Sequence, residues 1–163
     1  MNLFKKADLR SAFLLYCFYM NISIITVGSP KLSFAKEGIA EYLKRVQKFN
    51  KVEFLHIKEG KKTDKKVLQA IGSSFCVVMD EKGKQYTSIE FAKFLDKKEQ
   101  QSIGELSLVL GGPNGHTEAV YERGDIQMSL SKLTLPHDLA MLFTIETVYR
   151  SLSINKNHPY HRE

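Results

Sequence analysis

The chain has 163 residues, 43% of them hydrophobic and 26% charged. This composition is ordinary for a globular protein, and the length allows one domain with a hydrophobic core but excludes two large ones. A formal net charge of +6 favours an acidic partner such as nucleic acid, although a lysine-rich surface that binds no nucleic acid would give the same charge.

The first 19 residues differ from the rest. Lysines and an arginine precede an apolar stretch, as in a secretory signal peptide, but Asp8 interrupts the basic part and no small-residue cleavage site follows. The stretch is also shorter than the ~20 apolar residues that span a bilayer. We interpret residues 1–19 as an accessory or mis-assigned extension, residues 20–163 as a single domain, and the protein as having no membrane partner.

Cysteine usage favours a reducing compartment. The chain has two cysteines, Cys17 and Cys76, with no CxxC motif and no His/Cys cluster at metal-ligand spacing. Cys76 lies in an apolar run and is expected to be a small buried hydrophobe. We therefore predict a cytoplasmic location and no bound metal.

The first elements alternate between strand and helix. Residues 22–27 are rich in β-branched side chains and predict a strand. Apolar residues at helical spacing predict a helix over 33–49, with Ser33 as its N-cap, and 52–57 predict a second strand. The loop 58–66 holds five lysines, which either contact phosphates or simply lie in solvent.

The same alternation continues through the middle of the chain. A short helix near 67–71 is followed by a strand over 75–80, which is expected to end in a turn at 81–83. An apolar helical face predicts a helix over 87–98, and 106–110 predict a fourth strand.

The last elements complete the pattern. A helix over 117–123 precedes a weaker strand over 126–130 and a long final helix that ends near residue 153. Pro136 is expected at the first helical position, and Asp138 favours the positive end of the helix dipole. Strands that alternate with helices throughout predict a single α/β domain with a mainly parallel sheet flanked by helices.

Three predicted strands end in loops that should lie together. The run LVLGGPNG ends a buried strand in the turn residues Gly111 and Gly112, which let a ligand approach the backbone closely. The end of another strand at Met79 and the loop 130–135 should meet it, and such loops suit a flat aromatic ligand such as adenine. A glycine turn that only reverses the chain is the alternative.

Several familiar site motifs are absent from the sequence. GGPNGHTE lacks the Lys-Ser/Thr of a P-loop, and neither GxGxxG nor GxSxG occurs. Their absence disfavours kinases, classical dehydrogenases and serine hydrolases.

The C-terminal tail is polar but chemically rich. His158, Tyr160, His161 and Arg162 surround Pro159. A terminus is usually frayed. Against that default, such side chains stack on bases and bind phosphates.

Four segments together resemble the ribosomal RNA large subunit methyltransferase H family: LVLGGPNG, LSKLTLPH, ETVYR and NHPYHRE. The resemblance covers residues 20–163. It implies a SPOUT-class fold with a deep trefoil knot in its C-terminal half, and a homodimer. It also implies S-adenosylmethionine-dependent methylation of N3 of a pseudouridine in large-subunit (23S) rRNA, on the assembled ribosome.

The resemblance also assigns residues. Those that would bind the cofactor lie in the three loops: Met79, Gly111, Gly112, Leu130, Ser131, Lys132, Leu133, Thr134 and Leu135. Family members commonly have leucine where Met79 stands, a tolerable exchange in an apolar wall. They often have an arginine shortly after LTLPH, where this chain reads Asp-Leu-Ala-Met at 138–141, so an RNA-binding charge is not expected there.

Substrate binding and charge stabilisation are expected of Arg150, His158 and His161, with Tyr160 stacking on a base. A helix C-terminal role that complements the dipole is the alternative for Arg150. His137 is expected to be structural rather than a catalytic base.

A second function stays open from the sequence. A ribosome-binding or assembly module without catalysis would bind ribosomes in a salt-sensitive manner and need no cofactor. The enzyme predicts instead that Gly111→Val abolishes cofactor binding, because a side chain would occupy the ligand's space.

Overall fold

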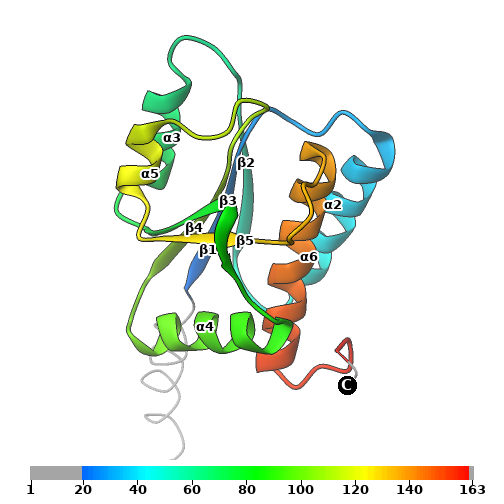
Figure 1. Cartoon of the computed structure of the whole chain (residues 1–163). Helices are drawn as coiled ribbons and strands as arrows, with labels where there is room; N and C mark the ends of the chain where they lie inside the picture. The colour runs from blue at the N-terminus through cyan, green and yellow to red at the C-terminus, as the bar shows by residue number, and fades with distance from the viewer. Residues whose placement is uncertain (1–19, 162–163) are drawn as a thin grey trace, which may run out of the picture.

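The computed structural model describes residues 20–161, so the interpretation of residues 1–19 lies outside the described residues, as does Arg162. Within residues 20–161, Figure 1 shows a five-stranded sheet between two helical layers. The strands are β1 (Asn21–Val27), β2 (Val52–Ile57), β3 (Phe75–Gln85), β4 (Glu105–Leu110) and β5 (Ile126–Ser129). The helices are α2 (Ser33–Val46), α3 (Thr63–Ile71), α4 (Ser88–Gln100), α5 (Glu118–Arg123) and α6 (His137–Asn155).

The sheet is entirely parallel, with the order β2-β1-β4-β3-β5. This confirms the predicted α/β class. Parallel strands run to the same edge of a sheet, so the loops after β4 and β5 meet the part of β3 around Met79 there. The central strands are apolar on both sides, as a sheet covered on both faces requires.

Successive residues of β4 point to opposite layers. Leu108 and Leu110 belong to the core under α2, α4 and α6, whereas Val109 belongs to the core under α3 and α5. In Figure 1 these two helix groups lie on opposite sides of the strands. The larger core buries one side of α6, including Met141, which is 0% exposed.

A side chain of α6, and not an N-cap residue of α2 itself, holds the backbone at the start of α2. The expected N-cap Ser33 is wrong, because Ser33 is already the first helical residue and Leu32 before it provides no side-chain cap. Asp138 Oδ2 instead accepts the backbone N–H groups of Lys31 and Leu32, both at 2.7 Å. These bonds hold the pKa of Asp138 below its usual value.

Three expected boundaries are also wrong. α3 begins at Thr63, so residues 63–66 of the expected lysine-rich loop are helical. The predicted turn at 81–83 belongs to β3, because after a bulge Lys84 and Gln85 pair with Met128 and Ser129 of β5. Pro136 is the N-cap position of α6, which begins at His137.

Candidate functional site

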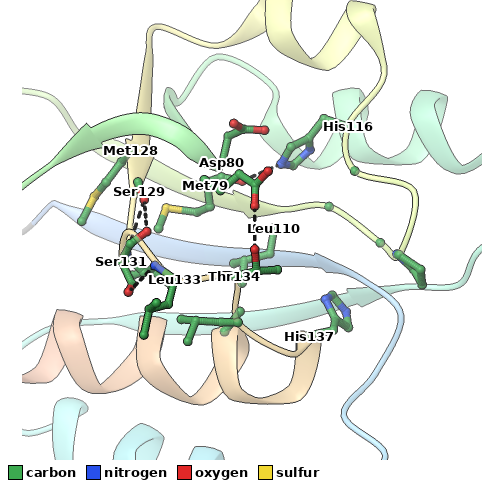
Figure 2. Close-up of a pocket in the computed structure, with 18 residues that line it drawn as sticks. Met79, Asp80, Leu110, His116, Met128, Ser129, Ser131, Leu133, Thr134 and His137 are labelled. Atoms are coloured by element: carbon green, nitrogen blue, oxygen red, sulfur yellow. Dashed lines mark hydrogen bonds between the residues drawn. The ribbon is translucent and has the colours of Figure 1, made fainter.

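The loops after β4 and β5 and the part of β3 around Met79 enclose a cleft of about 390 Å³. Figure 2 shows Leu133 and Thr134, on the loop before α6, opposite Met79 and Asp80 of β3. The predicted convergence of three strand ends is thus present. The cleft is lined by every residue expected to bind the cofactor except Lys132: Met79, Gly111, Gly112, Leu130, Ser131, Leu133, Thr134 and Leu135.

The glycine loop is closed by its own backbone. Gly115 donates its N–H to Gly112 O at 2.9 Å, and Gly115 has a φ of +75°. Gly111 and Gly112 do not adopt positive φ. A Cβ at Gly111 would lie 2.7 Å from the carbonyl carbon of Gly115, so the glycine is needed for the loop to fold back on itself. A side chain at Gly111 would therefore clash with the loop's own backbone whether or not a ligand is bound, and the predicted clash with the ligand stays a prediction.

The opposite wall is a loop shaped by serine side chains. Ser129 Oγ donates to Ser131 O at 2.7 Å, and Leu133 N–H donates to Ser131 Oγ at 3.0 Å. Such serine turns satisfy backbone groups that have no strand partner. They leave Leu133 74% exposed at the mouth of the cleft, an apolar side chain available to a ligand.

Two carboxylates of β3, Asp80 and Glu81, give the cleft its charge. The Tyr121 hydroxyl donates to Asp80 Oδ2, which lowers the pKa of Asp80 and raises that of Tyr121 to about 12. The Thr134 hydroxyl donates to Glu81 Oε2 at 3.1 Å and so joins the two sides of the cleft. A site with two ionised carboxylates favours a positively charged ligand.

His116 follows the glycine loop and contacts β3. Its Nε2 lies 2.9 Å from Met79 O. Because a carbonyl oxygen only accepts, this nitrogen must carry the proton. Burial lowers the pKa of His116, which favours the neutral ring.

The cleft therefore fits a ligand with a flat ring and a cationic group, as S-adenosylmethionine has. Its volume is in the usual range for cofactor sites, and apolar side chains with exposed loop backbone suit an adenine. The residues that would hold it are Met79, Gly111, Leu130, Leu133, Thr134 and Leu135. Their cofactor role stays a prediction.

The tail residues that were expected to bind substrate lie outside the cleft. Arg150 and the tail are at the far end of α6. Arg150 is thirteen positions along the helix from His137, about 20 Å at 1.5 Å per residue. Tyr160 packs on Tyr149, with ring centroids 4.6 Å apart, and His158 packs on Phe49 at 5.3 Å. None of Arg150, His158, Tyr160 and His161 lines the cleft of its own chain.

The carboxylate of Glu146 binds both Arg150 and Tyr160. Glu146 Oε1 accepts from Arg150 Nε at 2.9 Å, from Arg150 Nη2 at 2.5 Å and from the Tyr160 hydroxyl at 2.9 Å. The Tyr42 hydroxyl is 3.0 Å from that of Tyr160. Arg150 precedes the last turn of α6, so its observed partner is Glu146 and not the end of the helix.

Sequence reasoning missed Asp80, Glu81 and His116 as cleft residues. Asp80 and Glu81 follow Met79 directly, so the rule that ligands bind at the carboxyl ends of parallel strands would have found them. His116 was visible in GGPNGHTE, but nothing local shows that its ring turns back to β3.

Replacing Tyr121 with phenylalanine should destabilise the protein by about 1 kcal/mol at pH 7, at the low end for a hydrogen bond to a charged acceptor because the pair is partly exposed. The lowered pKa of Asp80 stabilises the fold above the unfolded value, near 3.9, and this contribution is lost as the pH falls through the folded value. Urea unfolding at pH 7 and below pH 3 should therefore show that the difference in unfolding free energy between wild type and Tyr121→Phe is smaller in acid.

Tyr86→Phe is the matched control, because the Tyr86 hydroxyl makes no hydrogen bond within residues 20–161 and its ring packs on Phe91 and Phe94. Equal losses in both variants at both pH values would contradict the role given to Asp80.

In the part of the chain that the structure describes, no three His, Cys, Asp or Glu side chains are grouped so that they could hold a metal. Among the same residues, no helix combines the length and the apolarity needed to cross a membrane.

Comparisons with known proteins agree on one family. A family model described as "Predicted SPOUT methyltransferase" matches residues 20–161. The ribosomal RNA large subunit methyltransferase H of Deinococcus radiodurans is 40% identical, over 88% of this chain and 99% of its own. The protein of the same name from Cytophaga hutchinsonii is 34% identical, over 87% and 99%.

Solved structures show the fold at low sequence identity. A probable methylase family protein from Haemophilus influenzae matches with a TM-score of 0.55 and 10% identity, over 88% of this chain and 71% of its own. A probable methyltransferase from Bordetella pertussis matches with a TM-score of 0.54 and 11% identity, over 84% and 98%. On the family model and the relatives, the chain belongs to the ribosomal RNA large subunit methyltransferase H family of SPOUT methyltransferases.

Proposed function

We propose that this protein transfers a methyl group from S-adenosylmethionine to N3 of a pseudouridine in large-subunit (23S) rRNA, on the assembled ribosome. The observation that carries the proposal is the cleft at the sheet edge, where three distant sequence segments form one acidic, partly apolar site. The names of the relatives supply the substrate class, large-subunit rRNA.

When bound, S-adenosylmethionine supplies an electrophilic methyl group on a sulfonium. The protein's main contribution is to hold donor and acceptor in line, which is worth roughly 7–11 kcal/mol for well-oriented reactants. Asp80 and Glu81 attract the cationic donor, and Leu133 with the backbone of 130–135 holds its flat ring. N3 must lose its proton, so cations such as Arg150 would stabilise the negative charge that develops on the base.

A homodimer would bring the two halves of the site together. Arg150, near the end of α6, and Tyr160, after that end, are too far from the cleft of their own chain to reach it. We therefore propose that each chain lends its tail to the cleft of a second copy. Large exposed apolar side chains on α2 and its entry and on the first half of α6 support such a contact: Leu32, Phe34, Leu139 and Phe143.

Two further features belong to the proposal. The family resemblance implies that the chain threads a deep trefoil knot in its C-terminal half. An enzyme acting on ribosomes would work in the cytoplasm, and Cys76, a buried thiol whose pKa is raised to about 11, suits a reducing compartment.

The test is transfer of labelled methyl from S-adenosylmethionine to ribosomes that lack this modification, with free rRNA in parallel. The proposal expects label on a pseudouridine of intact ribosomes and little on free RNA. Binding of S-adenosylmethionine without methyl transfer to ribosomes or to free rRNA would show that the proposed substrate is wrong. If cofactor binding also fails, the non-catalytic ribosome-binding module takes its place.

A further inference from the structure

A second, larger cavity of about 770 Å³ adjoins the cleft at the same edge of the sheet. It is formed where β1 and β2 end and is lined by Gly28, Ser29, Lys31, His56 and Lys58, among others. Pro113 and His137 line both cavities and thus form the boundary between them.

The walls of the second cavity combine apolar surface with positive charge. Val27, Leu32 and Pro136 supply apolar surface against which a base can pack. Lys31 and Lys58 are exposed, and neither ammonium group has an ion-pair partner among residues 20–161. Two acidic residues also line the cavity: Asp138 is committed to the two backbone amides that it accepts, and Glu59 is exposed next to Lys58.

His56 offers a defined acceptor. The Thr26 hydroxyl donates to Gly28 O at 2.8 Å, so its oxygen is left to accept from His56 Nδ1, also at 2.8 Å. The neutral ring then has an unprotonated Nε2, and desolvation lowers the pKa of His56, which favours that neutral form. An acceptor of this kind pairs with an imide N–H of a uridine-type base.

The boundary residue His137 has an unused polar atom. Its Nε2 is buried without a hydrogen-bond partner within residues 20–161, and it lies 3.8 Å from the position of a Cβ at Gly28. Buried polar groups in native structures are normally paired. An unpaired nitrogen in the wall between two cavities therefore indicates a site that a ligand completes.

We infer that the second cavity binds the acceptor nucleotide, with its uridine-type base against the apolar walls and its phosphate at Lys31 and Lys58. This inference rests on the proposed function and deepens it. Direct transfer requires the reacting atoms to come within about 3–3.5 Å, so the base would have to reach past Pro113 and His137, the boundary that the two cavities share, into the cofactor cleft.

Two variants test the site without touching the cofactor cleft. In Ser29→Trp, an exposed side chain that lines only the second cavity becomes large enough to fill part of it. In the double variant Lys31→Ala with Lys58→Ala, the proposed phosphate contacts are lost. The matched control is Lys93→Ala with Lys97→Ala, which removes equal charge from exposed positions of α4, at the other end of the sheet.

We expect the Lys31/Lys58 variant to raise the KM for ribosomes about tenfold or more and to weaken its salt dependence, as loss of phosphate contacts does. Ser29→Trp should lower kcat/KM about a hundredfold, since a blocked acceptor site loses transition-state binding. Calorimetry should find the affinity for S-adenosylmethionine unchanged in both, and the α4 control should resemble wild type.

Wild-type transfer with normal transfer by both variants would overturn this inference and leave the proposed function intact. An equal rise in the KM for ribosomes in the α4 control would also overturn it, because the loss of positive charge anywhere on the surface would then explain the effect. Uridine 5′-monophosphate titrated into ¹⁵N-labelled protein tests the cavity independently of turnover. Shifts centred on Ser29, Lys31 and His56 support it, and shifts elsewhere or none contradict it.

Discussion

Gly111→Ala should weaken the binding of S-adenosylmethionine by at least about a hundredfold, because the new Cβ would lie 2.7 Å from the carbonyl carbon and 2.8 Å from the carbonyl oxygen of Gly115. Both are backbone atoms, so the clash is relieved only by opening the loop. The loop is the floor of the cleft, and the donor's position changes with it. Isothermal titration calorimetry with the purified protein measures the effect.

Gly104→Ala is the matched control. Gly104 also lies at an end of β4, but a Cβ there meets nothing within 4 Å. Its affinity for the cofactor should equal that of wild type. Unchanged binding by Gly111→Ala, in a protein with a normal circular dichroism spectrum, would mean that the cleft at Gly111 is not the cofactor site.

Two inactive variants should restore activity when they are combined in one dimer. Gly111→Ala disables the cleft and Arg150→Ala disables the tail, so each homodimer should methylate ribosomes poorly. In a mixed dimer, one chain's intact cleft meets the other chain's intact tail. Random pairing makes about half of all dimers mixed, and one of the two sites in each mixed dimer works. The mixture should therefore have about a quarter of wild-type activity.

The measurement uses the two variants coexpressed with different tags, so that the mixed dimer can be isolated and assayed with ribosomes. No recovery in that species would contradict a site shared between chains. Full activity of the Arg150→Ala homodimer would remove Arg150 from the site altogether. The control pairs a chain that carries both changes with a wild-type chain. Each site then lacks either its cleft or its tail, so this dimer should be inactive if the site is shared.

The strands and their convergence were predictable because their signals are local. β-branched runs that end in glycine or proline mark the strand ends, and the parallel arrangement brings those ends to one edge. β2 begins and ends where predicted, at Val52 and Ile57. The extension of β3 past Asp80 was not predictable, because residues 81–85 have turn-like composition and join the sheet through β5.

The site was predictable as a set of loops but not in its side chains. Lys132 falls in the right loop, yet serine turns around it leave its side chain outside the cleft. The tail looked too polar to pack, but Tyr160 contacts Tyr149 and shares the Glu146 carboxylate. Such pairings depend on residues far apart in sequence, which no local pattern encodes.

The bond from Asp138 to the entry of α2 also orders events during synthesis. The carboxylate is 107 residues downstream of the Lys31 amide that it accepts. At about 5–20 residues per second, the first strand and its following loop wait roughly 5–20 s for that partner to be translated. β1 likewise lacks its neighbour β4 until the chain has passed Leu110. A truncated product that ends before α6 lacks the bond that holds the start of α2, so we expect proteases to degrade it faster than the full chain.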